Sequence, residues 1–142
     1  MKAEQGASGS MDEARTRTKN NARMTQDAKR GSRYGRIYFI SNGAAIKIGF
    51  AKDVEARMRD LQVANHMPLL LMGSIAAPQS DERQFHDRLE PHRLLGEWFT
   101  MHPNVYDLIA ELEDEDGWIE GESYEDYELK YFVMTGRRLP SR

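Results

Sequence analysis

Hydrophobic and polar positions along residues 36–50 alternate in a way that predicts a β-hairpin. Residues 36–40 are rich in β-branched and aromatic side chains, a composition that favours a strand. Asn42 and Gly43 come next, and this dipeptide is the strongest short hairpin signal, because both residues tolerate positive φ. The second strand is predicted to place Ile46, Ile48 and Phe50 on one face and Ala45, Lys47 and Gly49 on the other.

The spacing of apolar residues after the hairpin predicts a helix. Asp53 is suited to the N-cap, because its carboxylate can accept hydrogen bonds from the free N–H groups of the first turn. Val54, Met58 and Leu61 are spaced four and three apart and form one apolar stripe. Arg57 lies on a different face of this helix from the stripe.

The next two segments predict a third strand and a second helix. Residues 69–75 form a short apolar run between Pro68 and Pro78, which is typical of a buried strand. A helix is then expected over residues 81–90, with Ser80 as its N-cap.

The remaining pattern completes the predicted fold. Residues 94–99 are expected to form one short extended piece that closes the core. Pro103 suits the first turn of a helix over residues 104–113. A last helix is predicted over about residues 123–134, with Gly136 as its stop. Together these elements predict an α/β (α+β) fold, in which a small, three-stranded, mainly antiparallel sheet is flanked by helices.

Charge is strongly segregated along the 142 residues, although the formal net charge is only −3. Residues 1–33 carry eight Lys and Arg against four Asp and Glu. This composition predicts a disordered or frayed-helix arm that can contact a nucleic-acid backbone. Residues 107–128 carry eleven Asp and Glu and no Lys or Arg. The predicted organisation is a basic arm at 1–33, a folded domain at 34–112 and an acidic, aromatic appendage at 113–142.

The acidic appendage allows three interpretations. It can be a solvated extension with no further role. It can cover a basic site as a regulatory flap, because acids mixed with aromatic rings imitate a phosphate backbone with stacked bases. It can also dock a partner protein or a second copy of the chain, as a homodimer.

Two absences in the sequence narrow the functional classes. The chain contains no cysteine, which excludes disulfides, thiol catalysis and a cysteine-ligated zinc site. No apolar run approaches the length of a membrane span, and the N-terminus has no apolar signal core. We therefore expect a cytoplasmic protein that does not use a membrane.

Three side chains of the hairpin and first helix are candidates for chemistry on a phosphodiester. Tyr38, Lys47 and Arg57 are predicted to converge, and arginine can hold phosphate oxygens bidentately. A phenol with a lowered pKa can take a proton from water. In the alternative interpretation, Tyr38 only packs in the core and the two cations are solvated on the surface. These are the more frequent uses of such residues.

Glu82 and His86 are candidates for a metal site on the second helix. They are four residues apart and therefore lie on one face. A single carboxylate near a phosphate-binding cluster can hold Mg²⁺ (or Mn²⁺). The pair can instead bind Zn²⁺ or Mn²⁺, and a surface glutamate beside a partly buried histidine is the structural alternative.

Several of these motifs together resemble the GIY-YIG nuclease superfamily, and in particular its compact phage and bacterial subgroup. The first motif is Arg36-Ile37-Tyr38, and the second is Lys47-Ile48-Gly49, where most members of the superfamily have Tyr in place of the lysine. The Gly-Glu-Trp-Phe segment at residues 96–99 matches the closing segment of the subgroup. The resemblance covers residues 34–112, and Arg57 and Glu82 match the helix arginine and the metal-binding glutamate of the family.

The resemblance implies a metal-dependent endonuclease that hydrolyses DNA phosphodiester bonds, with Mg²⁺ (or Mn²⁺) as its cofactor. Tyr38 would orient the attacking water or act as its general base, and Lys47 would lower the pKa of Tyr38 or hold the nucleophile. Arg57 would stabilise charge on phosphorus, and Glu82 would hold the metal. Further substrate contacts are expected from Arg36, Lys52, Arg59, His86 and Arg93.

Two alternatives to a DNA endonuclease stay open. The substrate can be RNA. The chain can also be a catalytically inactive module that binds nucleic acid or a protein. Such a module would act as a regulatory or phage counter-defence factor through its acidic C-terminal segment.

Overall fold

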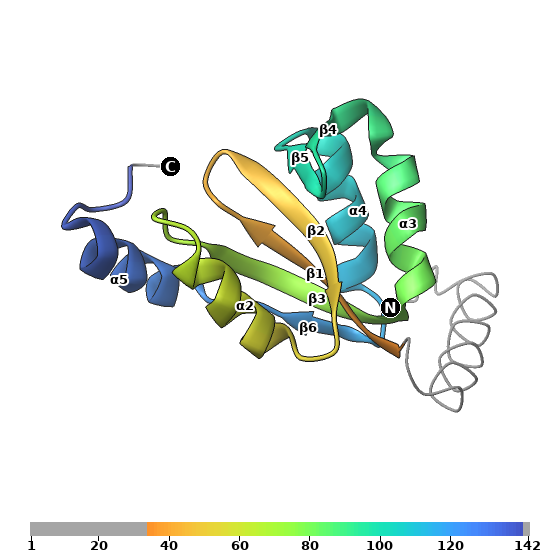
Figure 1. Cartoon of the computed structure of the whole chain (residues 1–142), viewed down its shortest axis with the longest axis horizontal. Helices are drawn as coiled ribbons and strands as arrows, with labels where there is room; N and C mark the ends of the chain where they lie inside the picture. The colour runs from red at the N-terminus through yellow and green to blue at the C-terminus, as the bar shows by residue number, and fades with distance from the viewer. Residues whose placement is uncertain (1–33, 141–142) are drawn as a thin grey trace.

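The computed structural model describes residues 34–140 and shows one six-stranded sheet with four α-helices (Figure 1). The strand order is β4-β5-β2-β1-β3-β6, and all five neighbouring pairs are antiparallel. The strands are β1 (Tyr34–Ser41), β2 (Ala45–Ala51), β3 (Leu70–Pro78), β4 (Arg93–Leu95), β5 (Trp98–Thr100) and β6 (Trp118–Glu120). The helices are α2 (Val54–Val63), α3 (Gln79–Arg88), α4 (Pro103–Glu113) and α5 (Tyr124–Thr135), with a 3₁₀ turn at Glu90–His92. The expectation for residues 1–33 lies outside the described part of the chain.

The predicted three-stranded sheet was therefore wrong, because the sheet has six strands. The three additional strands are three residues long each, too short to show an alternating pattern. Two of them replace the single extended piece expected at residues 94–99. That segment is a hairpin of β4 and β5, and Gly96 allows its turn with φ = 57°.

The central hairpin of β1 and β2 confirms the prediction from Asn42 and Gly43. The Oδ1 atom of Asn42 accepts from the N–H groups of Ala44 (2.8 Å) and Ala45 (2.7 Å). Gly43 adopts φ = 91°, which an L side chain rarely does. This turn fixes the register of the two strands, in which Tyr38 lies opposite Gly49.

The two faces of the sheet carry two separate cores, since side chains of a strand alternate between faces. Figure 1 shows α3 and α4 on one side of the sheet and α2 on the other. On the side of α3 and α4 the buried side chains include Ile37, Phe39, Ile46, Ile48, Leu89, Phe99, Leu108 and Ile109. On the side of α2 they are Tyr38, Ile40, Ala51, Val54 and Leu69.

Local signals set where the helices begin and end. The carboxylate of Asp53 accepts from the N–H of Ala56 at 3.0 Å, which confirms the predicted N-cap of α2. The second helix begins earlier than predicted, with Pro78 rather than Ser80 at its N-cap, because β3 runs directly into α3. The last helix ends as predicted at Gly136, which adopts a left-handed φ of 72°.

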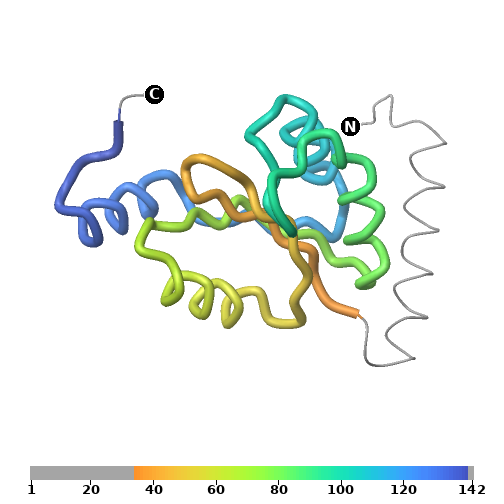
Figure 2. The backbone as a smooth tube through the Cα atoms, turned by 45° about the horizontal axis from the view of Figure 1, so that its top comes forward, coloured from red at the N-terminus to blue at the C-terminus, as the bar shows by residue number. Residues whose placement is uncertain are grey.

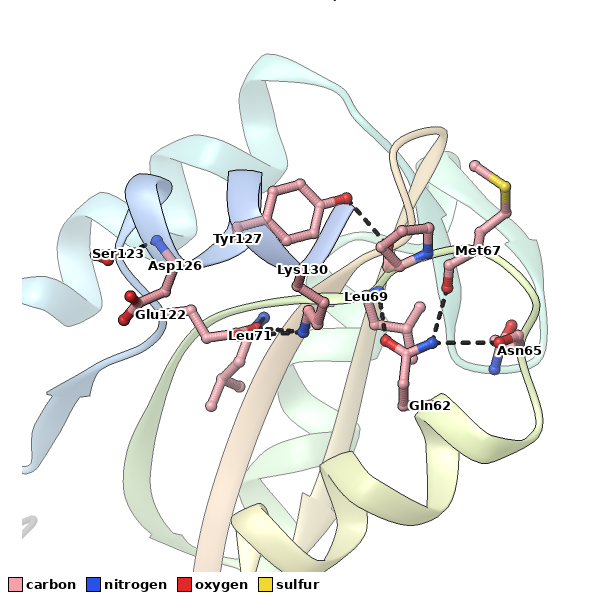
Figure 3. A network of polar contacts seen from close by, with 11 residues as sticks. Gln62, Asn65, Met67, Leu69, Leu71, Glu122, Ser123, Asp126, Tyr127 and Lys130 are labelled. Atoms are coloured by element: carbon pink, nitrogen blue, oxygen red, sulfur yellow. Dashed lines mark hydrogen bonds and ion pairs between the residues drawn. The ribbon is translucent and has the colours of Figure 1, made fainter. Parts of the chain in front are cut away.

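The acidic C-terminal segment joins the sheet through β6 and then crosses the end of β3. Gly121 lies directly against the backbone of β3, where a Cβ atom on this residue would be 1.8 Å from the carbonyl oxygen of Leu71. The carboxylate of Glu122 accepts from the N–H of Leu71 and from Nζ of Lys130, each at 3.0 Å (Figure 3). The buried hydroxyl of Tyr127 donates to the carbonyl of Pro68 at 3.0 Å (Figure 3). These contacts attach α5 to the rest of the fold.

No helix among residues 34–140 combines the length and apolar character that crossing a bilayer would require.

Two substitutions of Glu122 are expected to weaken the attachment of α5 and to lower the free energy of unfolding by different amounts. Glu122→Ala leaves the N–H of Leu71 without its acceptor, which costs about 1–3 kcal/mol of unfolding free energy. Glu122→Gln keeps an oxygen for this N–H and loses only the ion pair, which costs about 0.5–1 kcal/mol. Urea unfolding measures both values. Equal stabilities of the wild type and the alanine variant would contradict this account of the attachment.

Candidate functional site

The candidate site lies at an edge of β2 that no other described strand covers. Strand β5 pairs only with the first residues of β2, up to Lys47, and the N–H of Ile48 then donates to the carbonyl of Glu97 at 2.9 Å. Beyond this point the carbonyl groups of Ile48 and Phe50 face the open edge, because backbone groups two residues apart point the same way. The short length of β5 thus exposes a stretch of strand backbone in the middle of the fold.

Side chains from helices on the two faces of the sheet meet at this open edge. Nε2 of His86, from α3, lies 2.8 Å from the carbonyl oxygen of Ile48. Nη1 of Arg57, from α2, lies 3.4 Å from the carbonyl oxygen of Phe50. The open edge therefore lets residues of α2 and α3 lie close together, although these helices pack on opposite faces.

Tyr38 forms the floor of the site beside Gly49. The tyrosine is fully buried, and a Cβ atom on Gly49 would lie 2.3 Å from its hydroxyl oxygen and 2.4 Å from its Cζ. Only glycine at position 49 leaves room for the phenol across the β1–β2 pair. The hydroxyl lies 3.4 Å from Nη1 of Arg57, so the phenol points toward the open edge.

Burial raises the pKa of Tyr38, and the negative charges of Glu97 and Glu82 raise it further against an opposing hydrogen bond and charge from Arg57. The phenol therefore keeps its proton at neutral pH. Arg57 is the cation that opposes this rise, and the role expected of Lys47, to lower the pKa of Tyr38 or to hold the nucleophile, stays a prediction.

Lys47 is held in place by two neighbours from β5 and the turn before it. Its Nζ lies 3.0 Å from Oε1 of Glu97 and 5.6 Å from the ring centroid of Trp98. The lysine side chain is 16% exposed. A cation that is fixed by both a carboxylate and an indole face has little freedom to reach far from the site.

Glu82 has the most perturbed carboxyl group of the site. Its pKa is raised to about 7, first by burial and then by the charge of Glu97 and a hydrogen bond with it. Lys47 and Arg57 lower this pKa by a smaller amount. The Oε2 atom of Glu82 is buried and has no hydrogen-bond partner among the described residues. Burial and the neighbouring carboxylate of Glu97 thus favour the protonated form of Glu82, with a pKa of about 7.

This arrangement can bind a divalent cation and a phosphate group at the same place. Carboxylate oxygens are the ligands that Mg²⁺ and Mn²⁺ prefer, and Glu82 offers a buried oxygen for which residues 34–140 provide no hydrogen-bond partner. The exposed guanidinium of Arg57 lies on the other side of the open edge and can bind phosphate oxygens. Strongly shifted pKa values in such a cluster are typical of functional sites.

Three of the predicted substrate-binding residues have their polar groups engaged within the fold. The guanidinium of Arg36 donates to Oγ of Ser74 (2.8 Å) and to the carbonyl of Gly117 (2.6 Å), which ties β1 to the turn before β6. Arg93 pairs with Glu90 at 3.0 Å, donates to the carbonyl of Gly96 and packs on Phe99.

His86 is the third engaged residue. A carbonyl oxygen can only accept, so Nε2 of His86 carries a proton and donates it to Ile48. That nitrogen cannot also ligate Zn²⁺ together with Glu82.

Lys52, just before α2, and Arg59, in the middle of this helix, are exposed. Arg59 is two positions from Arg57 and therefore lies about 200° around the helix. Only a substrate that wraps around α2 can contact both arginines.

Glu97 is the residue that sequence reasoning undervalued. It forms an ion pair with Lys47. Its charge also acts on Glu82 and on Tyr38, which places it inside the candidate site. Its position in a tight turn after a three-residue strand gave no periodic signal.

The fold and the site define a small α+β domain with a carboxylate pair, two cations and a buried phenol at an open strand edge. The model of the T5orf172 domain matches residues 35–113, more than half of the chain. The chain therefore belongs to the T5orf172 domain family. Searches of curated proteins and of solved structures returned no significant match.

The family match corrects the resemblance inferred from the short motifs. Assignment to the GIY-YIG superfamily and its compact subgroup was wrong, because the family found over residues 35–113 is the T5orf172 domain. Motifs of three or four residues carried that resemblance, whereas the match extends over nearly all of the sheet and three helices.

The raised pKa of Glu82 predicts a pH-dependent gain in stability for Glu82→Gln. The folded protein keeps this proton up to about pH 7, whereas the unfolded chain loses it near pH 4.5. Between these values the folded state binds more protons, so its stability falls as pH rises. Glutamine has no proton to lose in this range, so the stability of the variant should not fall in this way. Between pH 5 and pH 8 the free energy of unfolding of Glu82→Gln should rise by about 1 kcal/mol relative to that of the wild type, a value reduced because the carboxyl is partly solvated.

Thermal and urea unfolding at pH 5 and pH 8 in a chelating buffer measure this difference without bound metal. Asp87→Asn is a matched control, because Asp87 is exposed on the same helix. A stability difference between Glu82→Gln and the wild type that does not change with pH would refute the assigned environment of Glu82.

Proposed function

We propose that this protein is a metal-dependent endonuclease that hydrolyses DNA phosphodiester bonds. The observation that carries the proposal is the pairing of Glu82 with Glu97 opposite Arg57, at an edge where the backbone is open. A nuclease must bind a metal ion and a phosphate side by side. This cluster offers oxygen ligands for the metal ion and a guanidinium for the phosphate.

Mg²⁺ (or Mn²⁺) is the proposed cofactor, with Glu82 as its ligand. Residues 34–140 contain no group of three or more His, Cys, Asp or Glu side chains placed to hold a metal. A site with one or two carboxylates still suits Mg²⁺, which commonly keeps several waters and binds substrate phosphates. When bound, the ion supplies Lewis-acid stabilisation of charge on the phosphoryl oxygens and the leaving group.

The residues around Glu82 take the remaining roles in the proposal. Arg57 binds the phosphate and stabilises the charge that develops on its oxygens. Tyr38 retains its proton, so its buried hydroxyl orients the attacking water or a phosphate oxygen through a hydrogen bond instead of acting as a phenolate base. Lys47, fixed by Glu97, provides a positive charge close to the reacting group.

The substrate contacts of the proposal lie around α2. Lys52 and Arg59 are exposed on or next to this helix and suit contacts with DNA phosphates. The basic residues 1–33 add sequence-independent attraction. The same chemistry can act on RNA, so RNA is included as a substrate in the test below. The lack of cysteine agrees with a cytoplasmic location, which stays a prediction.

A second candidate function is a catalytically inactive module that binds nucleic acid or protein through its acidic C-terminal segment. The observation in its favour is that Lys47 is neutralised by Glu97, while residues 107–128 carry eleven acids and no Lys or Arg. Such a surface repels DNA and suits a basic partner. Deleting residues 113–142 is a poor test of this candidate, because β6 pairs with β3 and the deletion removes a strand.

The nuclease proposal predicts metal-dependent nicking of supercoiled plasmid that depends on two residues. Arg57→Ala and Glu82→Ala should each lower the rate about 100-fold or more, because each removes charge stabilisation at the phosphate. Arg83→Ala and Asp87→Asn are matched controls, since both residues are exposed on α3, and they should keep wild-type rates. Branched DNA and single-stranded RNA are tested as further substrates under the same conditions.

An inert wild type on all three substrates, with Mg²⁺ and with Mn²⁺, would contradict the nuclease proposal. Activity that survives in both Arg57→Ala and Glu82→Ala would place the chemistry elsewhere. The inactive-module candidate predicts the first of these results, together with binding that is lost when exposed acids of residues 107–128 are replaced by their amides.

A further inference from the structure

Strands β2, β5 and β4 place Lys47, Trp98 and Leu95 in one row on the side of the sheet where α2 packs. Lys47 lies opposite Trp98, and Trp98 lies opposite Leu95. Opposed residues of neighbouring strands point to the same face. Lys47 also shares its face with Gly49, because side chains alternate along a strand. The row is therefore on the same face as Tyr38, which lies opposite Gly49.

The outer part of this row, Trp98 and Leu95, is open to solvent. Leu95 is 80% exposed, and Trp98 is partly exposed. Figures 1 and 2 show α2 apart from the β4–β5 hairpin that carries these two residues. Tryptophan is enriched at binding interfaces, because its ring offers a large apolar area together with a polar N–H. The row thus ends in a surface that a flat apolar group can reach.

Trp98 is also close to the candidate nuclease site. Nζ of Lys47 lies 5.6 Å from the ring centroid of Trp98 and 3.0 Å from Oε1 of Glu97. Glu97 in turn shares a hydrogen bond with Glu82. One ammonium group therefore joins the indole ring to the carboxyl groups of the site. Lys47 is two residues from Gly49 along β2, a distance of about 7 Å, so the row begins directly beside the open edge.

We propose that Trp98 is a stacking platform for an unpaired base of the nucleic-acid substrate, with Leu95 at its border. This inference rests on the proposed nuclease function, because a phosphate bound at Arg57 brings its own bases to the same face of the sheet. A stacked strand advances about 3.4 Å per nucleotide, so a base within a few nucleotides of that phosphate reaches the indole ring. Proteins that bind single strands combine such aromatic rings with cationic groups, and Lys47 and Arg57 supply the cations here.

The platform assigns a class of substrate to the site. In a duplex both faces of a base already stack on its neighbours, so a base can lie on Trp98 only where it has left the stack. The site therefore favours single-stranded, branched or locally opened nucleic acid over intact duplex. An apolar protein segment fits this surface less well, because it would bury the charges of Lys47 and Glu97, which costs free energy. A nucleotide instead places its base on the ring and its phosphate near the cations.

Quenching of tryptophan fluorescence by an oligothymidylate of about ten nucleotides tests the contact directly. The chain has two tryptophans, and Trp118 packs against the core beside Phe39. A base that stacks on Trp98 should quench the fluorescence of the wild type and of Trp118→Phe, whereas Trp98→Phe should lose the quenching. A chelating buffer prevents metal-dependent cleavage during the measurement. An oligouridylate of the same length distinguishes RNA from DNA as the source of the base.

Fluorescence anisotropy of the labelled oligothymidylate measures how much the stack contributes to affinity. Trp98→Leu keeps apolar bulk but removes the ring, so it should weaken binding about 5- to 100-fold, the usual effect of losing one base–aromatic stack. Trp98→Phe retains a ring and should bind within about threefold of the wild type. Leu95→Gln should weaken binding about threefold, because it removes apolar area beside the base.

Two controls separate stacking from other effects. A blunt duplex should bind the wild type and Trp98→Leu equally, because its bases are already stacked. Ile119→Gln should bind the oligothymidylate like the wild type, since Ile119 is 57% exposed on β6, at the other edge of the sheet. Circular dichroism checks that Trp98→Leu remains folded.

Two results would overturn the platform, whatever the outcome of the cleavage assay. One is quenching that is absent from the wild type or that persists in Trp98→Phe. The other is equal affinity for single strand and duplex that Trp98→Leu leaves unchanged, which is purely electrostatic binding. Conversely, Trp98-dependent binding of a single strand by a protein that cleaves no substrate would support the platform and contradict the nuclease proposal.

Discussion

The fit of the Tyr38 ring against Gly49 determines the geometry of the whole candidate site. Any side chain at position 49 would occupy the space of the phenol. The Asn42–Gly43 turn sets the register that brings the two residues opposite each other. This one close approach places a buried hydroxyl under a strand edge, where Arg57 of the next helix can reach both it and the backbone of β2.

The short length of β5 supplies the second constraint. If β5 continued past Lys47, it would cover the carbonyl groups that His86 and Arg57 now approach. Because β5 ends there, Glu82 of α3 and Glu97 of the β4–β5 turn come close together, and neither side chain is fully solvated. Burial of Glu82, and after it the charge of Glu97 and the hydrogen bond with it, raise the pKa of Glu82 to about 7. A fold selected for stability alone has no need to keep two carboxyl groups in contact. That cost is the physical reason for assigning function to this cluster.

Sequence reasoning succeeded where the signal was local. The hairpin, the cap at Asp53 and the stop at Gly136 each depend on a few adjacent residues, and all three are present in the structure. It failed for β4, β5 and β6, which have three residues each and depend on pairing with strands far away in the chain. The position of Glu97 and the raised pKa of Tyr38 depend on burial by these same distant elements. Short motifs also misled the family assignment, which needed the match over the whole domain.

Binding of Mn²⁺ measured by calorimetry tests the central proposal, that Glu82 is the ligand of a divalent cation. The account predicts one bound ion per chain near pH 7, with release of a proton that appears as a buffer-dependent enthalpy, because the ion replaces the proton held by Glu82. Glu82→Gln should abolish this binding, while Asp87→Asn should keep it. Equal binding by the wild type and Glu82→Gln would contradict the account.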